Sequence, residues 1–113
     1  MSILKELNDI LSTAGFKVET GVFKEKPDDK YIVLTPLADT YGIHADDRPV
    51  NDVQEVRLSL FTKGNYMAGK KTVTRVLLDS GFTVTDRRYV DYEEDTGYFH
   101  YAIDVAKNYG LEE

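Results

Sequence analysis

Two segments of the chain share one pattern, and this pattern strongly limits the folds open to it. Residues 10–20 read ILSTAGFKVET and residues 76–86 read VLLDSGFTVTD, so each has an aliphatic pair, a glycine and then Phe-x-Val-x. A glycine just after the last periodic residue favours the left-handed conformation that ends a helix. The alternation that follows indicates a strand. The repetition is either a duplicated helix-strand-strand unit or one capping device used twice.

Amphipathic helices are predicted before both glycines. Ser2 is placed to cap the first helix and Asn65 the second, because short polar side chains at this position bind the first unpaired backbone N–H groups. The apolar stripes expected to be buried are Ile3, Leu4, Leu7, Ile10, Leu11 and Ala14 in the first helix, and Tyr66, Val73, Val76, Leu77 and Ser80 in the second.

Strands are predicted at residues 16–23, 31–38 and 53–64, and on both arms of a long hairpin over residues 82–109. In the clearest of these, Val56 and Leu58 face one way and Arg57 the other. Pro36 is expected to place the end of its strand at an edge or a bend. The hairpin turn is predicted in residues 93–97, and the polar tail of residues 108–113 is expected to fray.

This element order, α-β-β-β-α-β-β, predicts a single α+β domain over residues 1–113. The economical arrangement is a mainly antiparallel sheet with two helices packed on one face. The other face is then either exposed to water or buried against a partner.

Composition narrows the possible functions. The chain has 113 residues and a net charge of -6. It has no cysteine, so disulfides, thiolate zinc sites and thiol catalysis are excluded. An acidic chain with few clustered cations is a poor nucleic-acid binder, because such binding rests on neutralising phosphates. No apolar run approaches the length of a membrane span and no signal peptide is recognisable, so synthesis and retention in a cytoplasm are expected.

The stretch YGIHADDRPV, residues 41–50, has the ligand types of a metal site in His44, Asp46 and Asp47. It also has the composition of an irregular polar loop, since Asp is a common turn residue and adjacent side chains in an extended loop diverge. The loop interpretation is favoured. The alternative is a small metal-dependent hydrolase that uses these three residues.

Other catalytic signatures are weak. KGNYMAGKK, residues 63–71, partly resembles a phosphate-binding loop, but Lys71 stands where a hydroxyl must bind Mg²⁺. His100 shares its strand parity with Tyr98, Ala102 and Asp104 and has no evident proton-transfer partner. No catalytic residue and no cofactor are therefore expected. A stand-alone ligand-binding or regulatory module is a further alternative to an enzyme.

Residues 41–106 contain YGIHADDRPV, EVRLSLFTKGNY and LLDSGFTVTDRRYVDYEEDTGYFHYAIDVA. In these stretches the chain resembles the small tail-completion, or tail-terminator, proteins of long-tailed phages and of prophages of Gram-positive bacteria. The resemblance implies a non-enzymatic virion protein whose copies form a ring at the head-proximal end of the tail. Its expected partners are further copies of itself, the tail tube protein and the head-tail connector. Neither a membrane nor a specific nucleic-acid sequence is an expected partner.

Under this interpretation the protein is assembled into the virion tail in the host bacterial cytoplasm, and it self-associates only weakly when alone. Tyrosines and charges are the expected contact residues, because tyrosine offers both apolar area and a polar tip. The candidate interface residues are Asp46, Asp47, Arg48, Tyr89, Tyr92, Glu93, Asp95, Tyr98 and Tyr101.

The metal alternative predicts a simple behaviour that the loop interpretation does not. A bound metal would stabilise the native state by mass action, so chelation would lower the melting temperature. We expect His44→Ala combined with Asp46→Ala to leave the melting temperature nearly unchanged, with or without EDTA, in differential scanning fluorimetry. A clear drop on chelation that the double variant abolishes would favour the hydrolase instead.

Overall fold

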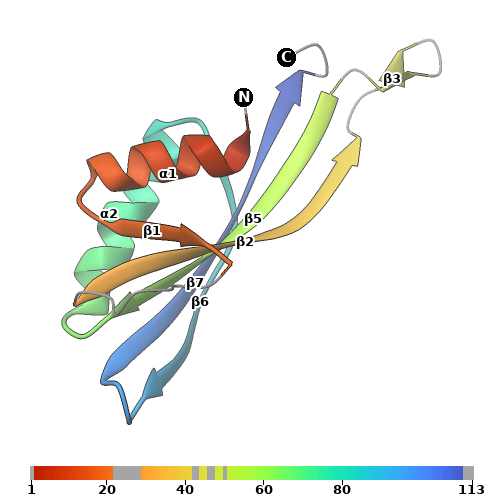
Figure 1. Cartoon of the computed structure of the whole chain (residues 1–113). Coiled ribbons are helices and arrows are strands. Elements are labelled where there is room, and N and C mark those ends of the chain that lie inside the picture. Colours follow the sequence, from red (N-terminus) through yellow and green to blue (C-terminus); the bar gives the residue numbers. More distant parts are fainter. Residues whose placement is uncertain (1, 22–28, 42–43, 46–47, 50, 111–113) are drawn as a thin grey trace.

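The computed structural model describes residues 2–21, 29–41, 44–45, 48–49 and 51–110; of residues 40–41, 44–45, 48–49 and 51 it describes the backbone. The elements in chain order are α1 (Ile3–Thr13), β1 (Lys17–Thr20), β2 (Lys30–Tyr41), β3 (His44–Ala45), β4 (Arg48–Pro49), β5 (Asn51–Thr62), α2 (Tyr66–Asp79), β6 (Thr83–Glu93) and β7 (Tyr98–Gly110). Figure 1 shows both helices beside a long twisted sheet. The predicted α+β class and the helix and strand order are confirmed, with β3 and β4 as a small addition.

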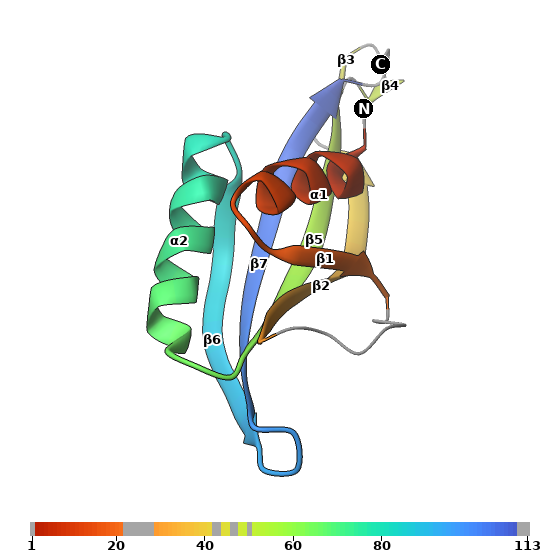
Figure 2. The ribbon, with the colours of Figure 1, turned by 60° about the vertical axis from the view of Figure 1, so that its left-hand side comes forward.

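The sheet has five strands in the order β1-β2-β5-β7-β6. All neighbouring pairs are antiparallel except β1 and β2, which are parallel. The central strand is therefore β5, whose residues 51–62 pair with β7 along their whole length. Figure 2 shows that α1 and α2 cover the same face of this sheet, as predicted.

Both helices begin at the predicted caps. The Ser2 side chain accepts a hydrogen bond from the backbone N–H of Lys5 at 3.1 Å, and the Asn65 side chain accepts one from Met67 at 3.0 Å. Each bond pairs a backbone donor that the first helical turn leaves without an intrahelical acceptor.

Both helices also end in the same hydrogen-bonded motif. The Phe16 N–H donates to the Leu11 carbonyl at 3.1 Å, and the Phe82 N–H donates to the Leu77 carbonyl at 3.0 Å. The glycine before each phenylalanine has positive φ, +98° at Gly15 for the first. This is the Schellman geometry, and all four apolar side chains belong to the core.

The repeated sequence pattern produces the same cap but not the same strand pairing. The strand after α1 pairs with β2 in parallel, whereas the strand after α2 pairs with β7 in antiparallel fashion. Of the two interpretations of the repeat, the structure favours one capping device used twice.

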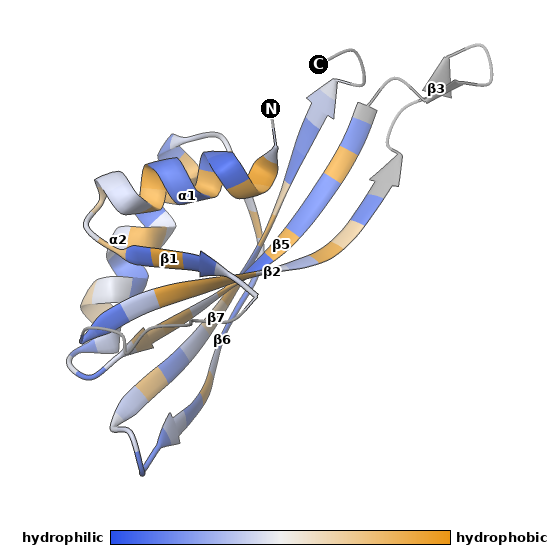
Figure 3. Cartoon of the chain, viewed as in Figure 1, coloured by the Kyte–Doolittle hydropathy of each residue, from blue (hydrophilic) through white to orange (hydrophobic). Residues whose placement is uncertain are grey.

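The hydrophobic core lies between the helices and one face of the sheet. Along β5 the predicted alternation holds: Val56, Leu58 and Leu60 are buried against the helices, while Arg57 and Ser59 face the other way. The fully buried side chains are Leu7, Leu11, Ile32, Leu34, Leu58, Leu60, Leu77, Ile103, Val56, Val73 and Val105. In Figure 3 apolar residues alternate with polar ones along the strands, because only one face of the sheet is covered.

Two strand boundaries differ from the predictions. The second strand continues past Pro36 to Tyr41, with a register shift between Pro36 and Ala38. Proline is tolerated there because β1 pairs with β2 only as far as Leu34, so this part of β2 lies at the sheet edge. The stretch around His44 was expected to be irregular, but its backbone includes the short antiparallel pair β3 and β4.

The expectation of a frayed tail from Asn108 was wrong for residues 108–110, and residues 111–113 lie outside the described part. Strand β7 continues to Gly110, and Tyr109 is buried. Its hydroxyl donates to Glu6 at 2.9 Å, and the ammonium of Lys107 pairs with the same carboxylate. Burial and the hydrogen bond to Glu6 raise the pKa of Tyr109. These contacts fasten the end of β7 to α1.

Lys107 also contacts the C-terminal end of α2. Its ammonium donates to the carbonyl of Ser80, the residue that caps the C-terminus of α2, at 3.2 Å. A cation is favourable at this end of a helix because the unpaired carbonyls carry partial negative charge. Among the described residues no helix is long and apolar enough to cross a membrane.

The core predicts the cost of truncating its side chains. Leu58 and Leu77 are both 0% exposed, one on the central strand and one on α2. We expect Leu58→Ala or Leu77→Ala to lower the free energy of unfolding by about 2–5 kcal/mol, through lost burial and the cavity left behind. Urea denaturation followed by circular dichroism measures this loss. Midpoints equal to wild type would contradict the assignment of these faces.

Candidate functional site

The sheet face opposite α1 and α2, hereafter the open face, has no helix or strand over it within the described residues. It is formed by alternate residues of β2, β5, β7 and β6. Because their side chains cannot be buried beneath a helix, they must either face water, pair with one another or contact a partner. Their packing therefore indicates what this face can do.

One half of the open face is a row of stacked rings. Tyr31 stacks on Phe61 with ring centroids 4.8 Å apart and an interplanar angle of 11°, and Phe61 stacks on His100 at 4.3 Å and 22°. Tyr98 meets Tyr31 edge-on at 5.2 Å. Tyr31 and His100 lie directly opposite Phe61 on its two neighbouring strands, so strand register creates the row.

The other half of the open face is a cluster of charges. Arg57 donates two hydrogen bonds to the Asp104 carboxylate, at 2.8 and 3.1 Å. Arg88 lies 4.0 Å from Asp104 and forms an ion pair with Asp86. The hydrogen bond to Asp104 raises the pKa of Arg57. Two cations and two anions cancel, so the centre of the open face is a neutral surface with its charges already paired.

His100 lies on β7 and belongs to the aromatic row. Its Nδ1 is 3.9 Å from a carboxylate oxygen of Asp91, while its Nε2 is buried without a hydrogen-bond partner in the described part of the chain. Burial lowers the pKa of His100, although Asp91 and Glu93 oppose that shift. The imidazole is therefore held neutral as a member of the aromatic row. The strand parity predicted for His100 is correct.

The predicted hairpin forms between β6 and β7 and extends past α2 (Figure 1). Tyr89 and Tyr92 are 47% and 45% exposed, as an interface prediction requires. Tyr98 and Tyr101 are only 6% and 7% exposed and offer little contact area, because Tyr98 packs on neighbouring rings of the open face and Tyr101 belongs to the core. Strand parity could not separate Tyr89 from Tyr101, because the two lie directly opposite each other and both contact Tyr66 of α2.

The hairpin tip is acidic and locally ordered. Glu93 is half-buried; its side chain accepts a hydrogen bond from the Thr96 hydroxyl at 2.9 Å, and its carbonyl accepts one from the Gly97 N–H at 2.7 Å. Gly97 has a φ of +80°, a conformation that suits glycine. Glu94 and Asp95 are exposed. The tip thus presents carboxylates on a defined turn.

The remaining candidates of the sequence lie in or beside undescribed residues. Asp46 and Asp47 fall outside the described part, and for His44 and Arg48 only backbone positions in β3 and β4 are described. Neither the metal alternative nor the contribution of Arg48 to an interface is tested. Elsewhere in the described part, no group of three or more His, Asp or Glu side chains is arranged to hold a metal ion.

The partial phosphate-loop match has a packing explanation. Helix α2 begins at Tyr66, inside the would-be loop. A Cβ on Gly69 would lie 3.4 Å from a methyl group of Leu60, an ordinary van der Waals contact, so this glycine lies in the packing of α2 against β5.

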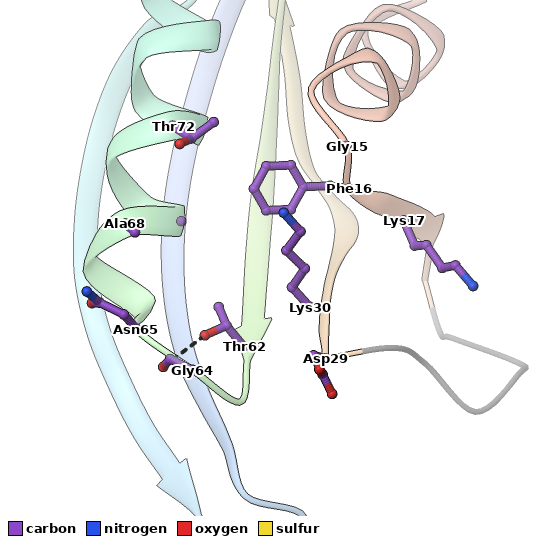
Figure 4. Close-up of a pocket in the computed structure, with 11 residues that line it drawn as sticks. Gly15, Phe16, Lys17, Asp29, Lys30, Thr62, Gly64, Asn65, Ala68 and Thr72 are labelled. Carbon is purple, nitrogen blue, oxygen red and sulfur yellow. Dashed lines mark hydrogen bonds between the residues drawn. The ribbon is translucent and has the colours of Figure 1, made fainter.

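Sequence reasoning missed a cleft of about 630 Å³ near the start of α2. Figure 4 shows its walls, formed by the end of β5 and α2 on one side and by residues around Phe16 and Lys30 on the other. The Lys30 ammonium lies 4.7 Å from the centre of the Phe16 ring, a cation–π contact. No sequence signal could have revealed this cleft, because its lining comes from separate segments that only the fold brings together.

Comparison of the chain with known protein-family models gives no match, and no curated protein matches it. Function is therefore inferred from the surfaces described above, together with the resemblance of residues 41–106.

The environment of His100 predicts a pH dependence of stability. Since its pKa is lowered from 6.5 in the folded state, the unfolded chain binds the proton first as pH falls. The contribution of neutral His100 to stability is complete above pH 6.5. It is lost as the pH falls from 6.5 through the lower pKa that His100 has in the folded state. We expect wild type to lose more unfolding free energy between pH 7.5 and 5 than His100→Gln does. Urea titrations at each pH measure the unfolding free energies of both proteins. Equal losses would contradict the lowered pKa of His100.

Proposed function

We propose that the protein is a structural subunit of a phage tail, a tail-completion or tail-terminator protein that forms a ring at the head-proximal end and joins tail to head. The observation that carries this proposal is the β6–β7 hairpin, which extends past α2 and exposes Tyr89, Tyr92 and an acidic tip. The sequence resemblance of residues 41–106 supports the same assignment.

The shape of the chain suits such a role. Its principal extents are 54 × 24 × 23 Å, because strands of up to 13 residues extend beyond the helices that cover their middle. A ring subunit needs a heterologous interface, in which one patch meets a different patch on the next copy. An elongated subunit with distinct ends and an open sheet face offers such separate patches.

Charge supports the proposal in a second way. A net charge of -6 repels phosphate, so DNA could pass through a ring of such subunits without adhering. On the open face Arg57 pairs with Asp104 and Arg88 with Asp86, so both of these cations are neutralised by carboxylates. In this role the tail tube protein and the head-tail connector would be the partners, and no reacting group is required.

Complementation in the phage that encodes the protein tests the proposal. Without the gene, we expect electron micrographs to show tails that are not correctly terminated and heads without tails, and the wild-type gene should restore infectious particles. Normal, correctly terminated tails in the absence of the gene would refute the tail-completion role.

The tip variant Glu94→Lys with Asp95→Lys tests the hairpin itself. Both side chains are exposed, whereas Glu93 takes part in the turn, so the fold should stay intact by circular dichroism. We expect plaque titres to fall by at least about tenfold, because reversed charges repel the former contact surface. The control, Glu19→Lys with Asp79→Lys, changes two exposed carboxylates elsewhere by the same net charge. Equal titres for both variants would place the essential contact outside the tip.

A further inference from the structure

A groove of about 340 Å³ lies along the first two turns of α2 and is lined by Asn65, Met67, Ala68, Lys70 and Lys71. We call it the lysine groove. Its lining contains two cations, no carboxylate and the side chain of Met67, which is 55% exposed. An exposed thioether on the same stretch of helix as two lysines is suited to a ligand that carries both apolar area and negative charge.

The cations of the lysine groove are not neutralised by the hairpin of the same chain. Lys70 is partly buried, with its ammonium 5.3 Å from the centre of the Tyr101 ring, and Lys71 is exposed. In the described part of the chain, no ion pair joins either lysine to a carboxylate. The positive charge of the groove therefore remains available to another molecule.

The hairpin tip has the complementary chemistry. Residues 91–95 read DYEED, with four carboxylates and no cation. Tyr92 is 45% exposed and lies between Asp91 and Glu93 in the sequence. The hydrogen bonds of Glu93 to Thr96 and Gly97 hold the turn in shape, so less conformational entropy is lost when it docks.

We propose that the hairpin tip of one copy docks into the lysine groove of a second copy, with Glu94 and Asp95 facing Lys70 and Lys71 and Tyr92 facing Met67. This inference rests on the proposed ring, for which it names both halves of the subunit contact. The contact is heterologous, since the donor is the β6–β7 hairpin and the acceptor is α2. Each copy can therefore give its tip to one neighbour and receive the tip of another.

The energetics of this contact suit a subunit that assembles only on demand. An exposed ion pair contributes little to affinity, so a single docking event is weak and sensitive to salt. When a tail tube already holds neighbouring copies, each further contact forms at high effective concentration. The isolated protein thus associates weakly at low ionic strength, and closed rings require the tail.

Charge reversal tests the contact with the full chain, by sedimentation equilibrium at low ionic strength. The tip variant Glu94→Lys with Asp95→Lys and the groove variant Lys70→Glu with Lys71→Glu should each raise the dissociation constant for self-association at least about fivefold. An equimolar mixture of the two should associate like wild type, because each reversed tip then meets a reversed groove. Combining all four changes in one chain should restore association as well.

Control variants keep the result interpretable. Lys70 contacts the Tyr101 ring, so Lys71→Glu alone serves where the double groove variant is destabilised in urea. Glu19→Lys with Asp79→Lys, and Lys5→Glu with Arg87→Glu, match the changes of net charge at exposed positions outside the tip and the groove. These controls should leave association unchanged.

Two results would overturn the inference: wild type that stays monomeric at low salt, or reversed variants whose mixture does not recover. Recovery in the mixture while the phage still makes normal tails without the gene would retain the contact and refute the tail role. The opposite combination is also informative. If correct tails require the gene but the reversed variants associate like wild type, the tail role stands and this contact is refuted.

Discussion

The structure depends on the apolar face of the central strand β5. Val56, Leu58 and Leu60 lie beneath both helices, and the strands on either side align Ile32, Leu34, Ile103 and Val105 with them. Because strand side chains alternate, the same register that buries these residues turns their neighbours to the opposite face. The core and the open face are thus two consequences of one register.

The chemistry of the open face follows from having no cover within the described residues. Its large side chains contact one another. Tyr31, Phe61 and His100 stack across three strands, and Arg57 forms an ion pair with Asp104 across two. This arrangement leaves the face close to neutral at its centre. The carboxylates of the hairpin tip and the lysines of α2 lie outside these pairs, and a weak, directional contact between copies is proposed there.

The polar network around Glu6 shows how a single side chain can join distant parts of the chain. Glu6 on α1 accepts from Tyr109, pairs with Lys107, and through Lys107 is connected to the C-terminal end of α2. The helices are held relative to the sheet by this network as well as by apolar packing. A partly buried network of this kind specifies one arrangement, because every member needs its partners in place.

Local chemistry in the sequence determined the helices, their caps, the hairpin turn and the alternation along β5. Ser2, Asn65 and the two glycines before Phe16 and Phe82 act within a few residues of themselves, so their roles can be read from spacing. The strand order and the burial of Tyr98, Tyr101 and Tyr109 were decided only by tertiary structure.

Those features depend on contacts between residues far apart in the chain. Tyr109 is buried because Glu6 lies beside it, 103 positions away in the sequence, and no local pattern encodes that meeting. The same reason separates two hairpin tyrosines. Tyr89 and Tyr101 lie opposite each other and both contact Tyr66, yet Tyr101 belongs to the core and Tyr89 is 47% exposed. The sequence by itself therefore determined which segments form helices and strands, while tertiary contacts decided which side chains remain exposed for recognition.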